Sequence, residues 1–306
     1  MKRLSKKQIR RTQNRIRKLH RHKKSRRRSV PVLSKIQTQT VGSVVSATSR
    51  GRSRQIPSVG VGFPLPDVLC IETNRERVLD FIYSVRQNMA PVIAQKLAAQ
   101  AKINRSRSRF GRIANWWKFE DLKEITPSAA LMVAAEFHRF TLLTGKKSEA
   151  INLHEWHPEV YARLEQIGFL ELLEITPDRK PFDGINDRRF LKFRSNNLAS
   201  NDVAGELMEE LELAAAHFEP GLAVNFERLH GALFEGLTNT KQHAHPEGYS
   251  QIFEHVNRWW ATGAVDYKQR RISVVIYDQG ITIPRSITSW GSFSHVQELL
   301  GKLGLN

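Results

Sequence analysis

Apolar residues recur at intervals of three and four along several stretches of the chain, and this spacing predicts helices with one buried face. These stretches are 76-ERVLDFIYSVRQNM-89, 158-PEVYARLEQIG-168, 204-AGELMEELELAAAHF-218 and 222-LAVNFERLHGALFEGLTNTKQHA-244. Short apolar runs between them, at 68–71, 149–154 and 272–277, predict strands. Strands that alternate with helices favour an α/β fold.

A further long helix is predicted within 116-WWKFEDLKEITPSAALMVAAEFHRFTLL-143, where a strand-like run and a turn at Pro127 precede it. This helix is apolar on most of its surface, so we expect it to be buried. A single histidine on such a helix is usually structural. We therefore interpret His138, like the pair Trp116 and Trp117, as part of the core or of its rim.

Breakers and polar stretches divide the chain into five parts. A linker rich in Ser, Thr, Val, Gly and Pro covers residues 29–66, and a polar connector covers 177–200. We expect folded units at 67–176 and 201–306, with a separate N-terminal arm at 1–28.

The N-terminal arm concentrates the charge of the protein. The chain has 48 Lys and Arg against 30 Asp and Glu, but 19 of these bases and none of the acids precede Asp67. Residues 2–28 alone hold fifteen bases and almost nothing that forms a core, which predicts a disordered segment or a lone helix. The arm either binds nucleic acid through its phosphates, without base specificity, or is a solvated tail.

The cysteine content and the hydropathy of the chain indicate its cellular location. Cys70 is the only cysteine, so an internal disulfide framework and a multi-cysteine metal site are excluded. No apolar run reaches the roughly 18 residues that cross a bilayer, and the basic N-terminus lacks the apolar region of a secretory signal. We expect a soluble cytoplasmic protein without a membrane partner.

The helix predicted at 222–244 carries two different faces. Its buried face is defined by Phe226, Leu229, Leu233 and Leu237. Glu235, Asn239 and His243 follow one another at intervals of four, so they fall along one stripe on another side of the helix. Three polar side chains on one stripe can act on a single ligand.

The run Glu235-x-x-x-Asn239-x-x-x-His243 resembles the N box of the GHKL superfamily, which includes DNA gyrases, heat-shock chaperones, sensor histidine kinases and mismatch-repair ATPases. Downstream, 272-ISVVIYDQGITIPRSI-287 is similar to the first glycine box of that family, with Asp278 and Gly280 at the end of an apolar strand. The two motifs stand in the order of the family.

This resemblance implies an ATP site that uses Mg²⁺. Asn239 would hold the metal through its amide oxygen, and Glu235 would act as the general base. Asp278 would accept from the exocyclic amine of adenine, and Gly280 would let the backbone approach the base. His243 and Lys241 would face phosphates, although a cation at a helix end also interacts with the helix dipole.

Two departures from the family pattern leave the activity open. Thr282 stands where a second glycine is usual, and the sequence ends about 28 residues after Asp278, before the lid and the second glycine box of the family. The alternatives are a truncated reading frame, a site completed by dimerisation or a partner, and a pseudo-ATPase that binds without hydrolysis.

Residues 66–176 resemble the STAS domains of anti-sigma-factor antagonists, through the order of strand, Pro-Ser turn, Ala-rich helix, strand and the run LEQIGFLELLEI. In that family a phosphorylatable serine begins the long helix, and Ser128 falls near this place. The usual Asp-Ser pair of the family is Thr126-Pro127 here, and a serine at a helix start is also a common cap.

Together the two resemblances imply an α/β protein with a small STAS-like α/β layer, followed by an incomplete two-layer α/β sandwich of the GHKL (Bergerat) type. The expected function is that of an ATP-binding regulatory protein, possessing ATPase or serine-kinase-like signalling activity and a protein partner, with homo-oligomers allowed. The alternative is a non-enzymatic nucleic-acid-binding protein that acts through residues 2–28. These two functions depend on different parts of the chain.

Overall fold

The computed structural model describes residues 44–47, 53–56, 61–101, 115–179, 187–216, 224–246 and 251–281. All of them belong to one compact unit of the chain. The basic arm at 1–28 lies outside the described residues, as do Thr282 and the segment that follows it.

The largest sheet is antiparallel and is built around β10 (Trp259–Asp266), which is buried along its whole length. On one side β10 pairs with β11 (Arg271–Asp278) over all eight residues. On its other side it pairs with β8 (Arg188–Phe190) and β9 (Arg194–Asn196). The polar connector expected at 177–200 therefore contains two strands of the main sheet, which the sequence analysis did not predict.

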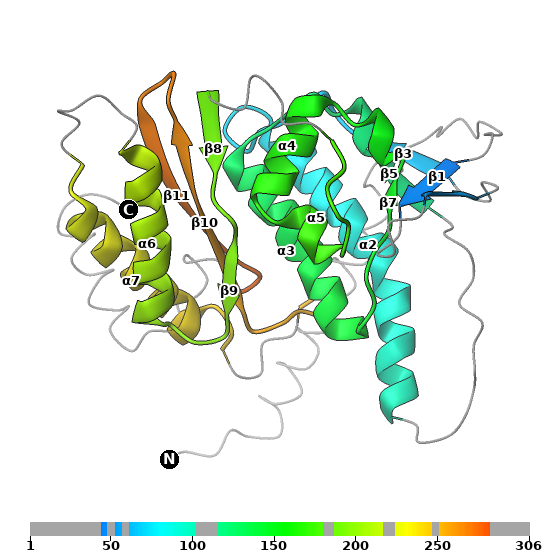
Figure 1. The fold of residues 1–306 in the computed structure, drawn as a ribbon. Coiled ribbons are helices and arrows are strands. Elements are labelled where there is room, and N and C mark those ends of the chain that lie inside the picture. The colour runs from blue at the N-terminus through cyan, green and yellow to red at the C-terminus, as the bar shows by residue number, and fades with distance from the viewer. Residues whose placement is uncertain are drawn as a thin grey trace, which may run out of the picture. The chain divides into compact units, whose positions relative to one another are not determined.

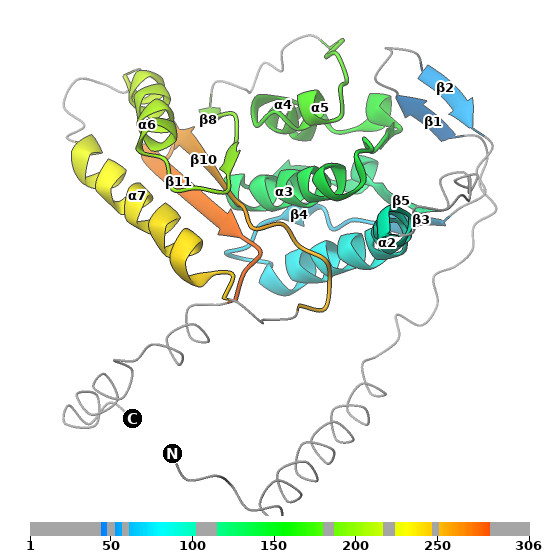
Figure 2. The ribbon, with the colours of Figure 1, turned by 90° about the horizontal axis from the view of Figure 1, so that it is seen from below.

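Helices α6 (Asn201–Ala215) and α7 (Phe226–His243) cover one face of this sheet (Figures 1 and 2). The side chains of Ser200 and Asn225 cap the two helices by accepting from backbone N–H groups of the first turns. The buried residues of this layer are Leu191, Ala204, Leu207, Met208, Leu211, Ala214, Leu233, Leu237, Trp259, Ala261 and Val265. The apolar face predicted for the helix at 222–244 is thus confirmed.

The opposite face of the sheet packs against α3 (Pro127–Thr144), which α2 (Arg75–Ala101) accompanies (Figure 2). Alternate strand residues point to opposite faces, so Trp260 and Ala264 join the core around α3 while their neighbours Trp259 and Val265 face α6 and α7. The sheet consequently lies between two helical layers.

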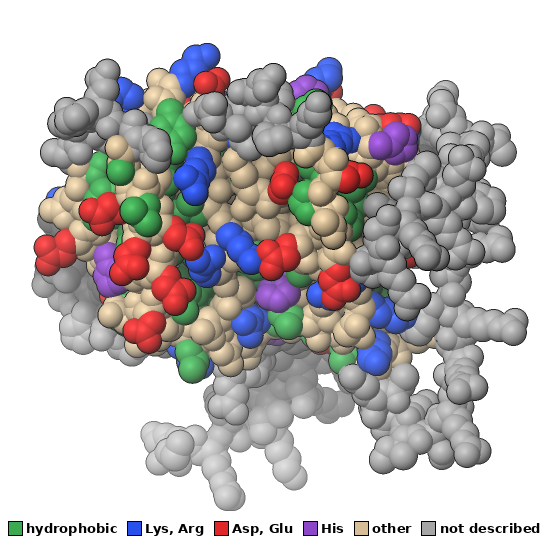
Figure 3. Space-filling model, in the orientation of Figure 1, with side chains coloured by type: hydrophobic (Ala, Val, Ile, Leu, Met, Phe, Trp, Pro, Cys, Tyr) green, Lys and Arg blue, Asp and Glu red, His purple; other side chains and the backbone are tan. Residues whose placement is uncertain are grey.

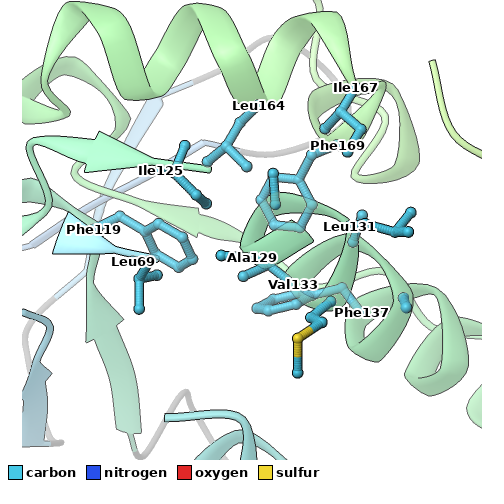
Figure 4. Close-up of a cluster of buried hydrophobic side chains, with 14 of the residues drawn as sticks. Leu69, Phe119, Ile125, Ala129, Leu131, Val133, Phe137, Leu164, Ile167 and Phe169 are labelled. Atoms are coloured by element: carbon cyan, nitrogen blue, oxygen red, sulfur yellow. The ribbon is translucent and has the colours of Figure 1, made fainter. Parts of the chain in front are cut away.

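The core around α3 is rich in aromatic side chains. Figure 4 shows Phe119, Phe137 and Phe169 converging beside small residues of α3. The ring centroids of Phe119 and Trp156 lie 4.7 Å apart in a stacked arrangement, and those of Phe137 and Phe169 lie 5.1 Å apart edge to face. The same core includes residues between 65 and 175 and residues of β8, β10 and β11, so the ranges 67–176 and 201–306 share it.

Short elements complete the fold around α3. Two of these are the helices α4 (Pro158–Gln166) and α5 (Phe169–Leu172), and the latter takes the place of most of the apolar run at 169–175. The 3-10 turns are η2 (Phe119–Asp121) and η3 (Leu153–Glu155). The expected strand at 149–154 reduces to β7 (Ala150–Ile151), because Asn152 adopts a left-handed backbone conformation that ends it.

The range expected as a linker, 29–66, also contributes strands. These are β1 (Val44–Ala47), β2 (Ser53–Ile56) and β3 (Val61–Pro64). Strand β1 pairs antiparallel with β2 and β7, and β3 pairs in parallel with β5 (Asn115–Lys118). The range expected as a linker therefore contains three short strands that the sequence analysis did not predict.

The expected strand at 68–71 is present as β4 (Val68–Leu69), which pairs in parallel with β6 (Glu124–Ile125). The mixed α/β class predicted from the alternating pattern is confirmed. In the part of the chain that the structure describes, none of the helices is both long and apolar enough to span a bilayer.

Candidate functional site

The polar stripe of α7 lies on the surface of the molecule. Glu235 and Asn239 are exposed, and Asn239 Nδ2 donates to Glu235 Oε1 at 3.3 Å across one helical turn. This bond uses the amide nitrogen of Asn239, so the lone pairs of its amide oxygen are not engaged by it. His243 continues the stripe at the last residue of the helix and is half-buried.

Asp278 lies at the end of β11, directly against the second half of α7. Its Oδ2 is 3.2 Å from the hydroxyl of Thr240, and its Oδ1 accepts from the backbone N–H of Gly280 at 2.8 Å. The Thr240 hydroxyl is also 3.2 Å from the carbonyl of Gly236, so two acceptors compete for its single proton. Thr240 follows Asn239 in sequence, and it therefore brings the helix motif into contact with the strand motif.

Gly280 allows the chain after β11 to approach the end of α7. The N–H of Ile281 donates to the carbonyl of Ala244 at 2.7 Å. A Cβ at position 280 would lie 2.2 Å from that carbonyl oxygen and 2.4 Å from the Ala244 Cβ, which is too close for any side chain. Among the described residues, the contact that requires glycine here is with α7.

A small pocket opens on the other flank of α7. It is lined by Asn197, Thr240, Lys241, His245, Asn257, Arg258 and Trp259 and has a volume of about 90 Å³. Lys241 lies two residues after Asn239, which is a rotation of about 200° around the helix axis. Lys241 therefore lines this pocket, whereas Glu235 and Asn239 do not.

Cationic and neutral donors dominate the pocket. Arg258 donates from Nε to the Ser195 hydroxyl at 3.2 Å and from Nη2 to the Ser195 carbonyl at 2.9 Å, which fixes the plane of its guanidinium. The ring of His245 stacks on that of His255 with centroids 5.1 Å apart. Burial lowers the pKa of His245, the neighbouring His255 lowers it further, and the carboxylate of Asp278 opposes these two effects.

The structure contains a buried ionic network that the sequence pattern did not predict. Glu136 of α3 is fully buried, and its Oε1 accepts from Arg86 Nη2 at 2.6 Å, Gln279 Nε2 at 2.9 Å and the hydroxyl of Tyr277 at 3.0 Å. Its Oε2 accepts from Arg139 Nε at 3.0 Å. The carboxylate thus connects α2 and α3 to the end of β11.

This network determines which way the end of β11 faces. Tyr277 and Gln279 are directed to Glu136, and strand alternation turns Asp278 to the opposite side, where Thr240 lies. Burial raises the pKa of Tyr277, and the adjacent carboxylate of Glu136 raises it further, so its hydroxyl keeps its proton and remains a donor. The network therefore holds the Asp278 side chain towards α7.

Ser128 lies in the first turn of α3 but does not cap it, because the N-cap residue is Thr126. The Ser128 hydroxyl donates to Glu72 Oε1 at 3.2 Å and lies 3.2 Å from the Thr126 hydroxyl. A phosphoryl group on Ser128 would gain from the helix N-terminus but would be repelled by the Glu72 carboxylate.

The oxygen atoms on the exposed stripe are of the kind that Mg²⁺ prefers as ligands. Asn239 offers an amide oxygen and Glu235 a carboxylate oxygen, and a magnesium ion usually takes one or two protein oxygens and keeps several waters. Within the described residues, no group of three or more His, Cys, Asp or Glu side chains could hold a metal ion.

Comparisons of the chain with protein-family models, with curated proteins and with solved structures found no match.

Proposed function

We propose that the protein binds Mg-ATP on the flank of α7 that carries Glu235 and Asn239. The observation that supports this most directly is the contact of 3.2 Å between Thr240 and Asp278. It joins two motifs that are 38 residues apart in sequence and that a nucleotide site of the GHKL type requires side by side. Under this proposal, the acceptor for adenine and the ligand for magnesium would lie on neighbouring elements.

Each residue has a role that its surroundings allow. Asp278 is held by two donors and keeps lone pairs for the exocyclic amine of adenine, which distinguishes ATP from GTP because guanine has a carbonyl at that position. Asn239 would ligate Mg²⁺, which bridges the phosphates of the nucleotide. Glu235, one turn before it, would accept a proton from a water or a hydroxyl group. His243 would face the ligand at the end of the stripe.

The packing on one face of the sheet also supports a site of the GHKL (Bergerat) type, whereas α3 covers the other face, so the sheet is not part of a two-layer sandwich. Two helices, α6 and α7, pack on one face of an antiparallel sheet, and the glycine-box-like turn directly follows β11, the outermost strand of this sheet among the described residues. Lys241 has no part in this proposal, because it lies on the opposite flank of α7.

The regulatory part of the proposal concerns the range 67–176, whose STAS-like character is inferred from its sequence pattern. Because this range shares a core with β11, nucleotide binding at Asp278 would act on α2 and α3 through Tyr277, Gln279 and Glu136. A partner protein that recognises α2 or α3 would then respond to ATP.

Calorimetric titration of Mg-ATP into the full chain tests the nucleotide site. We expect saturable binding that requires magnesium, is weakened at least about tenfold (~1.4 kcal/mol) by Asn239→Ala and by Asp278→Ala, and is much weaker for Mg-GTP. Exposed residues of the same types, Asn201→Ala and Asp80→Ala, serve as controls that leave binding unchanged.

Hydrolysis is a separate question with its own variant. If the site is an ATPase, Glu235→Gln retains nucleotide binding and loses phosphate release, because only the proton acceptor is removed. Absence of heat from Mg-ATP with a chain that is folded by circular dichroism would refute the nucleotide proposal.

A further inference from the structure

We propose that the pocket lined by Lys241, His245 and Arg258 binds a phosphate-sized anion, on the side of α7 away from Glu235 and Asn239. Thr240, which contacts Asp278, lies between the two sides and also lines this pocket. This inference goes beyond the proposed function and does not depend on it. It rests on the composition of the pocket lining, on unsatisfied donors within it, and on its size.

The lining of the pocket is suited to a negatively charged group. It contains one lysine, one arginine, one histidine, two asparagines and a threonine around the edge of Trp259. None of the lining residues is Asp or Glu, and the one carboxylate found beside them, that of Asp278, is 3.2 Å from the Thr240 hydroxyl and is outnumbered by the charges of Lys241 and Arg258. These side chains come from three places: the segment after β9, the last turns of α7 and the segment that leads into β10. Three separate elements thus direct donors into one small volume.

The ring of His245 is a buried polar group without hydrogen bonds among the described residues. Both of its ring nitrogens are buried, and neither has a hydrogen-bond partner among the described residues. A buried polar atom without a partner costs about 1–3 kcal/mol. A neutral imidazole has one N–H donor and one acceptor nitrogen, so an anion in the pocket would accept from the donor and remove the part of the cost that belongs to it.

Arg258 and Lys241 supply the charge. The two bonds from Arg258 to Ser195 hold the guanidinium in place before any ligand arrives, which reduces the entropy lost on binding. Burial lowers the pKa of Arg258, which indicates that its charge is partly desolvated and would gain from a nearby anion. Lys241 is exposed and can move towards the ligand.

The size of the pocket limits the ligand. Pockets for whole drug-sized molecules have about 300–1,000 Å³, several times the volume of about 90 Å³ found here. A single tetrahedral phosphate is therefore a suitable occupant, and an entire nucleotide is not. The phosphate can be free or can belong to a larger molecule whose remainder extends over the exposed residues Asn197 and Asn257.

The test is a titration of the full chain with inorganic phosphate at constant ionic strength. Binding is measured from the NMR ring signals of His245 in histidine-labelled protein. Adenosine, which has no phosphate group, and chloride are the matched ligands. We expect phosphate to give saturable shifts and to raise the pKa of His245. Adenosine and chloride leave the His245 signals unmoved. Phosphoserine added in place of phosphate shows whether a phosphate attached to a larger group also enters.

Variants separate the two flanks of α7. Lys241→Ala weakens phosphate binding at least about tenfold, equivalent to ~1.4 kcal/mol, whereas Lys268→Ala, in the exposed β10–β11 turn, has no effect. Asn239→Ala leaves phosphate binding intact, whether or not the chain binds ATP. Equal shifts in the wild-type chain and Lys241→Ala, or shifts that never saturate, would overturn the proposal. Loss of the phosphate response in Asn239→Ala would do so as well, since it would assign the anion to the other flank.

Discussion

Glu136 is the centre of a buried ionic network. Its carboxylate is out of contact with solvent and accepts from two arginines, a tyrosine and a glutamine. Both arginines are held near it, and Arg139 is itself 1% exposed. Removing the negative charge therefore leaves positive charge buried without compensation, which is more costly than losing an ion pair on the surface.

We predict that Glu136→Gln lowers the free energy of unfolding by about 3–5 kcal/mol, because the arginines lose their counter-charge while the shape of the side chain is kept. Urea unfolding followed by circular dichroism measures the loss. Glu171→Gln is the control, since the pair of Glu171 with Lys192 is exposed and is worth less than about 1 kcal/mol. Similar losses in the two variants would show that Glu136 has no special role.

His138 links stability to pH through one hydrogen bond. Its Nδ1 accepts from Trp260 Nε1 at 3.1 Å, so the bond requires the neutral ring. Burial lowers the pKa of His138 from 6.5 to about 4, and the charges of Arg258 and Lys147 contribute. The unfolded chain therefore binds a proton between about pH 6.5 and 4 that the folded chain does not, and the stabilisation present above pH 6.5 is lost as the pH falls through this window.

We predict that the chain loses stability from pH 7.5 to pH 4.5, and that His138→Asn removes on the order of 1 kcal/mol of this loss after allowance for the partial exposure of the ring. Asparagine keeps an acceptor near the position of Nδ1 but does not titrate. Urea unfolding of both proteins at the two pH values gives the comparison. A parallel dependence in the two proteins would contradict the assignment to His138.

The contacts of the buried network could not be predicted from the sequence. The helix at 127–144 was expected to be buried, and His138 and Trp116 were correctly interpreted as core or rim residues. Glu136 and Arg139 lie three residues apart in this apolar helix, and this spacing is a sign of an internal ion pair. Their partners Arg86, Tyr277 and Gln279 are distant in sequence, so only the folded arrangement identifies the hub.

Among the elements, α7 is the one whose packing can be tested most cleanly, since it contains two glycines in different surroundings. A Cβ at Gly231 would meet no atom within 4 Å, whereas a Cβ at Gly236 would lie 2.4 Å from Cδ1 of Ile276 in β11. Alanine at either position reduces the flexibility of the unfolded chain and favours the helix. At position 236 this gain is opposed by displacement of Ile276.

We predict that Gly231→Ala raises the free energy of unfolding by about 0.5–1 kcal/mol and that Gly236→Ala is less stable than Gly231→Ala by about 1 kcal/mol or more. Thermal and urea unfolding of the two variants measure the difference, and each serves as the control for the other. Equal stabilisation by both changes would contradict the prediction, because it would mean that the terminal methyl of Ile276 moves aside at no cost in stability.

The elements that the sequence predicted well are those with a clear period. The helices at 201–215 and 226–243 and the strand at 271–278 follow the apolar spacing, and the exposed stripe of Glu235 and Asn239 follows from it too. Strands β8 and β9 were missed because they are three residues long and rich in arginine. Arg188 is accommodated by Asp266 at 2.9 Å and Glu124 at 2.9 Å, and these partners are distant in sequence.

The site was predictable in part for the same reason. Glu235, Asn239 and His243 are related by helical spacing alone, but the contact of Thr240 with Asp278 depends on how α7 packs on β11. The pocket beside Lys241 includes Asn197, which directly follows β9, a strand that the sequence pattern did not reveal. Its separation from the stripe therefore required the structure.

For the whole molecule, the distribution of charge is uneven. Acidic side chains gather over α6, as Figure 3 shows, and this helix carries Asp202, Glu206, Glu209, Glu210 and Glu212 but no Lys or Arg. The fifteen bases of residues 2–28 are concentrated in the arm. Any strong binding to polyanions should therefore depend on the arm, which is the alternative function considered from the sequence.

We predict that the full chain binds single- or double-stranded nucleic acid without sequence preference and that affinity falls steeply with salt, with a log–log slope near −5 if about six phosphates are neutralised. Deletion of residues 2–28 should abolish this binding. Fluorescence anisotropy at several salt concentrations measures it, with Asn239→Ala as the control that retains it. The deletion must end before Val44, where β1 begins. Unchanged binding by the shortened chain would remove the arm from consideration.

The central strand β10 pairs with strands that come before it and after it in the sequence. Strands β8 and β9 precede it by more than sixty residues, and β11 follows it. Its two faces are covered by α3 from one half of the sequence and by α6 and α7 from the other. A polypeptide cut between residues 179 and 187 would thus yield two pieces that each expose a large apolar surface. We expect each piece to aggregate when it is produced alone. The two pieces produced together should reassemble by fragment complementation. The site of the cut is therefore a suitable place to divide the chain for a split reporter.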